Sequence, residues 1–320
     1  MMRETLRRVR KYWPQYRWSN VAAMIRHMAA PPETCDLDFT DRLVVITGAT
    51  SGIGYLTARK FASRGARLLT INRNAEKSRA LRTEIAHDFG VACDDLIADL
   101  SRLEDIHRVG NALAALGQPI HVLIHNAGMY LNRRGVTEDG VEMNLAVHFL
   151  APFVINYLLR ERMQRDGQGR ILFVSSEGYR FAVWGLRLDD LGWEKRRYSG
   201  LGAYGAAKLA QILTMHILAE ELAESGVTVN AMHPGMVRTS TGRENSPLYR
   251  WFKGSILDRL SQPATISAEA LYYLGVSPAL AGVTDRFFHL THEEELAPPA
   301  RDREVAERLW QIGLQLGRLA

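Results

Sequence analysis

The segment Thr47-Gly48-Ala49-Thr50-Ser51-Gly52-Ile53-Gly54 joins an apolar run, residues 43–47, to a stretch of helical periodicity, residues 52–63. Three glycines at a strand-to-helix turn let the backbone approach a ligand closely, and the helix N-terminus that follows favours an anionic group such as a pyrophosphate. The spacing is GxxxGxG, which differs from the GxGxxG dinucleotide fingerprint. We therefore predict a nucleotide site at this turn, with contacts from Gly48, Thr50, Ser51, Gly52, Ile53 and Gly54.

Apolar runs continue to alternate with longer helical segments after this turn. Strands are expected over residues 43–47, 67–72, 91–98, 120–125, 170–175, 227–232 and 286–290, and helices over residues 52–63, 75–89, 103–116, 141–159 and 203–223. The strands are apolar throughout, as in a parallel sheet that is covered on both faces. The pattern predicts an α/β fold with a doubly wound parallel sheet of the Rossmann type. We expect one domain over residues 41–320 after an extension, residues 1–40.

Composition excludes several other classes of protein. Apolar residues make up 47% and charged residues 23% of the 320 residues, an ordinary globular balance. No run approaches the ~18 apolar residues of a membrane-spanning helix. Cys35 and Cys93 are too few for a disulfide framework, so the expected compartment is the cytoplasm. The histidines have no HExxH or CxxC neighbours, so no metal site is predicted.

The net charge of +5 comes from the N-terminal extension. Residues 1–30 hold seven of the 40 basic side chains and one of the 35 acidic ones, which leaves 33 basic and 34 acidic side chains in the rest. The main body is therefore neutral, and nucleic-acid binding is not expected. Basic and aromatic residues such as Trp13, Tyr16 and Trp18 suit a helix that lies on a membrane surface. A packing arm on the body, or on another subunit, fits the same composition.

Residues after the next three expected strands extend the cofactor prediction. Arg73 stands where NAD-specific sites usually carry a carboxylate, so NADP(H) is favoured over NAD(H), although a surface arginine would look the same. Asp99-Leu100 offers a carboxylate to an adenine amino group, or alternatively a helix cap. Asn126-Ala127-Gly128 provides small residues against which a cofactor can lie, or simply a tight turn.

Two further motifs suggest proton-transfer chemistry. Ser176 ends the fifth expected strand, and Tyr204 and Lys208 lie four residues apart, on one face of a helix. An ammonium about 4 Å from a phenolate contributes roughly 4 kcal/mol at an effective dielectric of 20. That interaction would lower the pKa of the tyrosine by about three units. Tyr204 is therefore predicted to act as an acid/base near neutral pH.

In chain order these motifs resemble the short-chain dehydrogenase/reductase family: TGxxxGxG, DL, NAG, an internal Asn, SS, YxxxK and PG. The resemblance runs from about position 41 to the C-terminus. Within the family the chain is most similar to the retinol-dehydrogenase and WW-domain-oxidoreductase branch. That branch shares the long insertion before the tyrosine, here residues 188–199, and the tail, residues 306–310. The 28-residue separation of Ser176 and Tyr204 exceeds the commoner family spacing, but this branch carries that insertion.

The resemblance also implies roles for individual residues. Tyr204 would be the acid/base, and Lys208 would lower its pKa while holding the nicotinamide ribose. Ser176 would hydrogen-bond the substrate oxygen, and Asn144 would support a water relay to Lys208. His125 departs from the asparagine that the family usually has before NAG. Further contacts to the cofactor are expected from Pro234, Gly235, Val237 and Thr239.

We expect an NADP(H)-dependent oxidoreductase that interconverts an alcohol and a ketone or aldehyde. Many aromatic residues precede Tyr204 or follow Thr239, which favours a small lipophilic substrate of retinoid, steroid or lipid type; ordinary loop packing would account for them equally well. A C=C reductase similar to the protochlorophyllide reductases and a non-catalytic nucleotide sensor are the alternatives. A homodimer is expected by analogy with the family. The aromatic and apolar residues in question are Tyr179, Phe181, Trp184, Trp193, Tyr249, Trp251, Phe252, Ile256 and Leu257.

Overall fold

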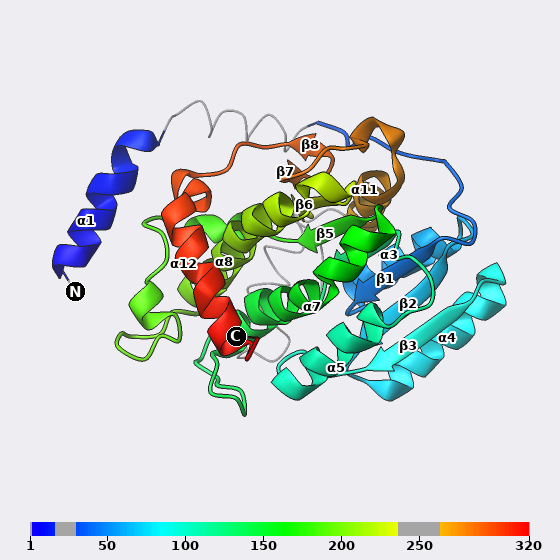
Figure 1. The fold of residues 1–320 in the computed structure, drawn as a ribbon, viewed down its shortest axis with the longest axis horizontal. Helices are drawn as coiled ribbons and strands as arrows, with labels where there is room; N and C mark the ends of the chain where they lie inside the picture. Colours follow the sequence, from blue (N-terminus) through cyan, green and yellow to red (C-terminus); the bar gives the residue numbers. More distant parts are fainter. Residues whose placement is uncertain (1, 17–29, 236–262, 320) are drawn as a thin grey trace.

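The computed structural model describes residues 2–16, 30–235 and 263–319. At its centre is one eight-stranded sheet in the order β3-β2-β1-β4-β5-β6-β7-β8 (Figure 1). Neighbouring strands are parallel except β8, which pairs antiparallel with β7. The strands are β1 (Leu43–Thr47), β2 (Arg67–Asn72), β3 (Cys93–Ile97), β4 (Val122–His125), β5 (Arg170–Val174), β6 (Thr228–His233), β7 (Arg286–His289) and β8 (His292–Glu293).

Helices cover both faces of the sheet, which confirms the doubly wound fold (Figure 1). Successive residues of β1 point into opposite cores: Val45 belongs to one cluster, and Val44 and Ile46 belong to the other. Continuous apolar strands follow from this arrangement because neither face of the sheet meets water. One face carries α5 (Leu103–Ala114), α7 (Ala151–Asp166), α8 (Gly200–Glu221) and α12 (Arg303–Leu316); the other carries α3 (Gly52–Ala62), α4 (Ala75–Phe89) and α11 (Ala264–Val276).

The helix expected over residues 141–159 is not one regular helix. It consists of α6 (Met143–Leu145), a π-helical segment η2 (Ala146–Leu150) and α7. A π turn inserts an extra residue into the hydrogen-bond ladder, and hydrophobic periodicity alone does not reveal such an insertion. Short 3-10 helices complete the described chain: η1 (Trp13–Gln15), η3 (Glu177–Phe181), η4 (Leu188–Asp190), η5 (Ala223–Ser225), η7 (Pro278–Leu280) and η8 (Pro298–Arg301).

The N-terminal helix α1 (Met2–Tyr12) lies at the edge of the molecule, beside the segment between β5 and α8 (Figure 1). The hydroxyl of Tyr12 donates to Asp302, 2.5 Å away, and the side chain of Tyr12 is buried. Tyr16 donates to the carbonyl of Val183 at 2.9 Å. The ring of Trp184 packs against the rings of Trp13 and Tyr16. The described part of the extension is therefore a packing arm on the body of the same chain.

Within the described residues, one helical stretch, Met143–Asp166, is long and apolar enough to cross a membrane. Its most apolar window is 72% buried inside the protein. Burial against α5 and α8 accounts for the apolar composition. This stretch therefore gives only weak evidence of a membrane span.

Candidate active site

The predicted nucleotide turn lies where the carboxyl ends of β1 and β4 meet. Gly48 has φ +71°, and a Cβ at this position would lie 2.9 Å from Cα of Ala127. A Cβ on Gly54 would lie 2.3 Å from Nδ2 of Asn126. A larger residue would therefore force the two turns apart at either position. The strand-end motifs that were predicted separately form one tightly packed structure.

The same turn leaves open space in front of α3. Gly52 has φ +58°, and no described atom lies within 4 Å of the position its Cβ would take. Ser51 is the N-cap residue of α3, but its side chain makes no capping hydrogen bond in the described structure, and the first turn has no acidic residue. The first backbone N–H groups of α3 are thus available to an anion. These residues fit a dinucleotide pyrophosphate.

Asn126 and Thr47 hold this turn in place. Nδ2 of Asn126 donates to the carbonyls of Thr47 and Gly48 at 3.0 and 2.9 Å. The hydroxyl of Thr47 accepts from the backbone N–H groups of Asn126 and Ala127 at 3.0 and 2.9 Å. The amide of Asn126 therefore acts on the glycine turn, while the small residues Ala127 and Gly128 follow it. Thr47 belongs to the quoted glycine segment, but its position in the sequence did not predict that its hydroxyl holds the Asn126 turn. We call the contacts between Thr47 and Asn126–Ala127 the clamp.

Asn72 fixes the end of β2 and presents Arg73. Its Oδ1 accepts from the backbone N–H of Ala49 at 2.8 Å, and its Nδ2 donates to the hydroxyls of Thr70 and Ser78. Asn72 is buried, whereas Arg73 is exposed directly after it. The buried amide of Asn72 thus ties the end of β2 to the nucleotide turn, and Arg73 follows it in the chain.

Asp99 follows β3 and makes a local turn. Its Oδ1 accepts from the backbone N–H and the hydroxyl of Ser101 at 2.9 and 2.7 Å. The first turn of α5 is capped by a different residue, since Asp139 accepts from the N–H of Leu103 at 2.8 Å. Asp99 is therefore not the cap of α5. Leu100 is buried beside it.

Ser176 and Tyr204 converge from β5 and α8. The hydroxyl of Ser176 accepts from the N–H of Gly178 at 3.0 Å and so begins η3. A Cβ on Gly178 would lie 2.7 Å from Cε1 of Tyr204 and 3.1 Å from Oγ of Ser176. Gly178 thus lies between the two predicted catalytic side chains. No sequence motif marked it, although a glycine two residues after Ser176 was a signal that could have been used.

Lys208 is buried below Tyr204 on the same helix. Its Nζ donates to the carbonyl of Val174 at 2.7 Å, which joins α8 to the end of β5. Burial lowers the pKa of Lys208 to about 7. The charge of this lysine therefore changes near neutral pH, the range in which it would tune a neighbouring phenol.

Asn144 lies in a hydrogen-bonded triangle with two residues that the motifs did not identify. Its Nδ2 contacts Oε1 of Glu142 and the hydroxyl of Tyr198, each at 2.9 Å. Tyr198 also donates to Oε1 of Glu142 at 2.9 Å, and Oε2 of Glu142 accepts from the N–H of Leu145. The side-chain amide of Asn144 thus hydrogen-bonds Tyr198, a residue of the segment between β5 and α8.

A buried charged group borders Ser176. Arg180 forms ion pairs with Glu177 and with Glu294, whose side chain is 1% exposed. Burial raises the pKa of Glu177 to about 7, opposed by Arg180 and aided by Glu294. Burial and neighbouring positive groups lower the pKa of His233, at the end of β6, to about 3. Sequence patterns gave no sign of this group because its members come from three separate segments.

The remaining predicted positions divide into described and undescribed ones. Pro234 and Gly235 follow β6, and the carbonyl of Pro234 accepts from the hydroxyl of Ser267 at 2.6 Å. Val237, Thr239 and the second aromatic segment lie outside the described residues. In the described ranges, no group of three or more His, Cys, Asp or Glu side chains is placed to hold a metal ion.

The first aromatic segment does not form a single open apolar lining. Tyr179 is fully buried, packs on Phe287 and accepts at its hydroxyl from the N–H of Ala297. Trp193 stacks on Arg196 and packs on the ring of Tyr198. Of these residues Phe181, at 55%, is strongly exposed beside the Tyr204 region. Most of these aromatic residues therefore pack the insertion itself.

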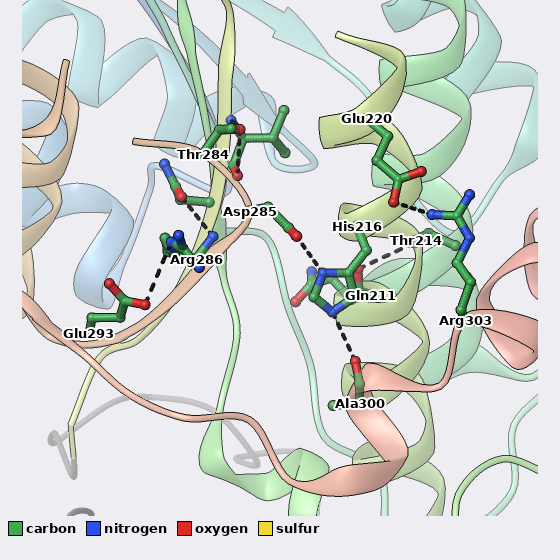
Figure 2. Close-up of polar contacts among 12 residues, drawn as sticks. Gln211, Thr214, His216, Glu220, Thr284, Asp285, Arg286, Glu293, Ala300 and Arg303 are labelled. Atoms are coloured by element: carbon green, nitrogen blue, oxygen red, sulfur yellow. Dashed lines mark hydrogen bonds and ion pairs between the residues drawn. The ribbon is translucent and has the colours of Figure 1, made fainter. Parts of the chain in front are cut away.

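A cavity of about 370 Å³ lies away from this site, toward the C-terminal half of α8. Figure 2 shows its charged groups in pairs: His216 with Asp285 and the carbonyl of Ala300, and Glu220 with Arg303. None of the predicted site residues lines it. These pairs join α8 to the residue before β7, to η8 and to α12, and they include none of the predicted catalytic residues.

Comparisons with known proteins show which family the chain is similar to. A family model described as short chain dehydrogenase matches residues 42–186, and one described as Enoyl-(Acyl carrier protein) reductase matches residues 190–289. Retinol dehydrogenase 13 of Homo sapiens is 33% identical over 280 residues, 86% of this chain and 84% of the relative. The WW domain-containing oxidoreductase of Homo sapiens is 31% identical over 289 residues, 87% of this chain and 69% of the relative. A short-chain dehydrogenase from Sphingobium yanoikuyae, solved in complex with NADPH, has a TM-score of 0.60 at 28% identity and covers 73% of this chain and 83% of that one.

Proposed function

The chain belongs to the short-chain dehydrogenase family, and from that premise we propose that it is an NADP(H)-dependent oxidoreductase that interconverts an alcohol and a ketone or aldehyde. One observation carries the proposal: Ser176 and Tyr204 both lie against Gly178, and the buried Lys208 follows Tyr204 on α8. These residues lie at the carboxyl ends of the strands, where the glycine turn also lies. Bound nicotinamide supplies or accepts the hydride in this chemistry.

The protein's own groups handle the proton and the substrate oxygen. In the reductive direction Tyr204 gives its hydroxyl proton to the oxygen that the hydride leaves negatively charged. Ser176 donates a hydrogen bond to that oxygen and orients it. Lys208 in its charged form stabilises the phenolate that Tyr204 becomes, since opposite charges a few ångströms apart attract strongly where water is excluded. The oxidative direction reverses the proton transfer.

We propose NADP(H) as the cofactor. Gly48, Thr50, Ser51, Gly52, Ile53 and Gly54 would hold the pyrophosphate, and Arg73 would bind the 2′-phosphate because a guanidinium makes paired hydrogen bonds to phosphate. Asp99 would face the adenine. The solved relative with NADPH supports this choice.

We propose an apolar substrate of retinoid, steroid or lipid type. The names of the relatives, among them retinol dehydrogenase 13, support this class. Exposed Phe181, near Tyr204, provides an apolar contact of the required kind.

Contact with a membrane surface from a cytoplasmic location is a further proposal. Trp13, at 67%, and Leu6, at 50%, are exposed on the N-terminal arm, and Arg7 and Arg10 are exposed beside them. Apolar and basic side chains on one surface suit anionic lipid. Pelleting with anionic vesicles, with and without residues 1–30, tests this; equal pelleting would contradict it. We also propose a homodimer, for which light scattering is the test.

A panel of carbonyl compounds, followed by loss of NADPH absorbance and repeated with NADH, tests the main proposal. Turnover of bulky lipophilic ketones or aldehydes above that of short polar ones is the expected result, and comparable turnover of a small sugar would contradict the substrate class. Reduction of a C=C bond is a second candidate, favoured by the reductase model that matches residues 190–289. Product analysis distinguishes the two reactions.

A further inference from the structure

The π-helical segment Ala146–Leu150 directs His148 toward the catalytic tyrosine. The ring of His148 meets the ring of Tyr204 edge to face, with centroids 5.3 Å apart and planes at 90°. His148 is buried, and its carbonyl accepts from Nε2 of Gln211, one turn beyond Lys208 on α8. A π turn in a long helix commonly marks a functional position. Here it holds an imidazole against the helix that carries both Tyr204 and Lys208.

The contacts of His148 fix which ring nitrogen carries the proton. Its Nε2 lies 2.7 Å from the carbonyl oxygen of Met129 and 3.3 Å from the backbone nitrogen of the same residue. A carbonyl can only accept, so the shorter contact requires a proton on Nε2. Nδ1 is then an acceptor with a lone pair. Gly128 allows this contact because a Cβ there would lie 2.7 Å from Cε1 of His148.

Nδ1 is buried and has no hydrogen-bond partner among the described residues. A buried acceptor without a partner costs free energy, and one at a functional site indicates a missing water or ligand group. Burial, together with the positive charge of Lys208, keeps the pKa of His148 well below the usual value for histidine. The ammonium of Lys208 has three donors, and the carbonyl of Val174 accepts one of them. A donor with unused hydrogens therefore lies near an acceptor that lacks one.

The amide donor of Asn144 is engaged by other groups, while its Oδ1, like Nδ1 of His148, is buried without a partner among the described residues. Its donor contacts Glu142 and Tyr198, one turn before the π segment. His148 is the polar residue of this helix whose ring contacts Tyr204 and whose titration depends on Lys208.

We propose that His148 is a positioning residue for the Tyr204–Lys208 pair: its unprotonated Nδ1 accepts a hydrogen bond from one buried water, and that water accepts a hydrogen bond from Nζ of Lys208. This hydrogen bond holds the ammonium in place and charged, the support of Lys208 that the family resemblance assigns to Asn144. The inference rests on the proposed oxidoreductase function.

The test compares His148→Phe, which keeps a ring against Tyr204 but has no acceptor, with His148→Asn, which restores an acceptor. His125→Phe is the matched control, since His125 is also buried but hydrogen-bonds Asn156 instead. The readouts are kcat and KM for alcohol oxidation against pH, and thermal unfolding. Besides His148, the titratable groups that face Tyr204 or Lys208 are Tyr130, which packs on Tyr204, and His233, whose pKa Lys208 helps to lower.

His148→Phe is expected to lower kcat roughly 10- to 100-fold, with the KM for NADP⁺ within about 3-fold. The rising limb of its kcat–pH profile should move up by about one pH unit, because a less stabilised ammonium leaves Tyr204 protonated to higher pH. His148→Asn should recover most of the wild-type kcat, and its rising limb should return close to the wild-type pH. His125→Phe should lose stability without moving the limb. An unmoved limb in His148→Phe, or no recovery in His148→Asn, would overturn the proposal.

A measurement that needs no turnover separates this inference from the proposed function. The ¹⁵N chemical shifts of histidine-labelled protein, assigned by comparison with His148→Phe, show whether Nδ1 of His148 is unprotonated from pH 6 to 9. A proton on Nδ1 would overturn the inference even if the enzyme reduces carbonyls. A wild-type protein without activity on any carbonyl or alcohol would instead overturn the proposed function.

Discussion

Nζ of Lys208 donates a hydrogen bond to the carbonyl oxygen of Val174, 2.7 Å away. This bond ties the fourth residue after Tyr204 on α8 to the last residue of β5, two positions before Ser176. The lysine is thereby held inside the protein, where its ammonium is poorly solvated and its pKa falls to about 7. The proposed proton transfer would therefore depend on a positive charge that burial destabilises.

Tyr204→Phe should lower kcat for carbonyl reduction by about 10²–10⁴-fold, since the phenyl ring has no proton to give. The ring contacts with Gly178 and His148 remain, so NADPH affinity should change less than about 3-fold. Steady-state absorbance assays and fluorescence titration with NADPH measure the two quantities. Retained NADPH oxidation would rule out the assigned role.

Lys208→Met should abolish most activity yet raise the free energy of unfolding by about 1–3 kcal/mol at pH 7, after the unpaired Val174 carbonyl is counted. The folded-state pKa of Lys208 is depressed, so the unfolded state binds more protons between about pH 7 and 10.5. The free-energy cost of burying the charged lysine is fully present below pH 7. It disappears as the pH rises toward the pKa that Lys208 has in the unfolded state. The free energy of unfolding of the wild type, measured in urea, should thus rise toward that of the variant between pH 7 and 10. A constant difference over that range would contradict the buried charge.

Arg73→Ala should raise the KM for NADPH about 10- to 100-fold and leave the KM for NADH nearly unchanged, because one charged hydrogen-bonding pair is worth roughly 1.5–3 kcal/mol. Arg165→Ala, at an exposed position of α7, is the control for loss of one positive charge. Equal effects on both cofactors would show that Arg73 does not read the 2′-phosphate.

Thr47→Val should weaken the nucleotide turn, because the backbone N–H groups of Asn126 and Ala127 would lose their acceptor. Each unsatisfied donor costs about 1–3 kcal/mol, so a clear drop in unfolding free energy and in NADPH affinity is expected. Thr47→Ser keeps the hydroxyl and should remain close to wild type. Calorimetry of both variants provides the comparison, and an unaffected valine variant would exclude this clamp.

Tyr12→Phe should loosen the N-terminal arm by removing the hydrogen bond to Asp302, at a cost of about 1 kcal/mol. Limited proteolysis should then cut the arm several-fold faster, while the rest of the chain keeps its wild-type digestion pattern. Tyr16→Phe, which loses the contact with Val183 nearer the surface, should have a smaller effect. The same cleavage rate in Tyr12→Phe and wild type would show that Trp13 and its neighbours hold the arm without this bond.

The sequence predicted the fold where local patterns carry it. The strands β1 to β7 and the glycine turn follow from apolar runs and from backbone freedom at Gly48 and Gly52. The helix α12 was not predicted, although Ala306, Leu309, Trp310 and Gly313 recur at helical spacing and are buried.

Long-range contacts explain what the sequence could not show. The orientation of His148 depends on a π turn. The ion pair between Arg180 and Glu294 joins residues more than 100 positions apart. Neither leaves a periodic signal. The catalytic motifs were recognisable because their members lie four residues apart or at strand ends, whereas the residues that position them come from other segments.

The contact between Tyr12 and Asp302 also bears on the order in which the molecule assembles. The two residues are 290 positions apart, so Tyr12 is synthesised long before the acceptor of its hydroxyl exists. Synthesis runs from the N-terminus, so the contacts of the arm with Val183, Trp184 and Leu186 can form before the contact with Asp302, the N-cap residue of α12. A ribosome-stalled chain that ends before Asp302 should therefore hold α1 less firmly than a chain that includes this residue.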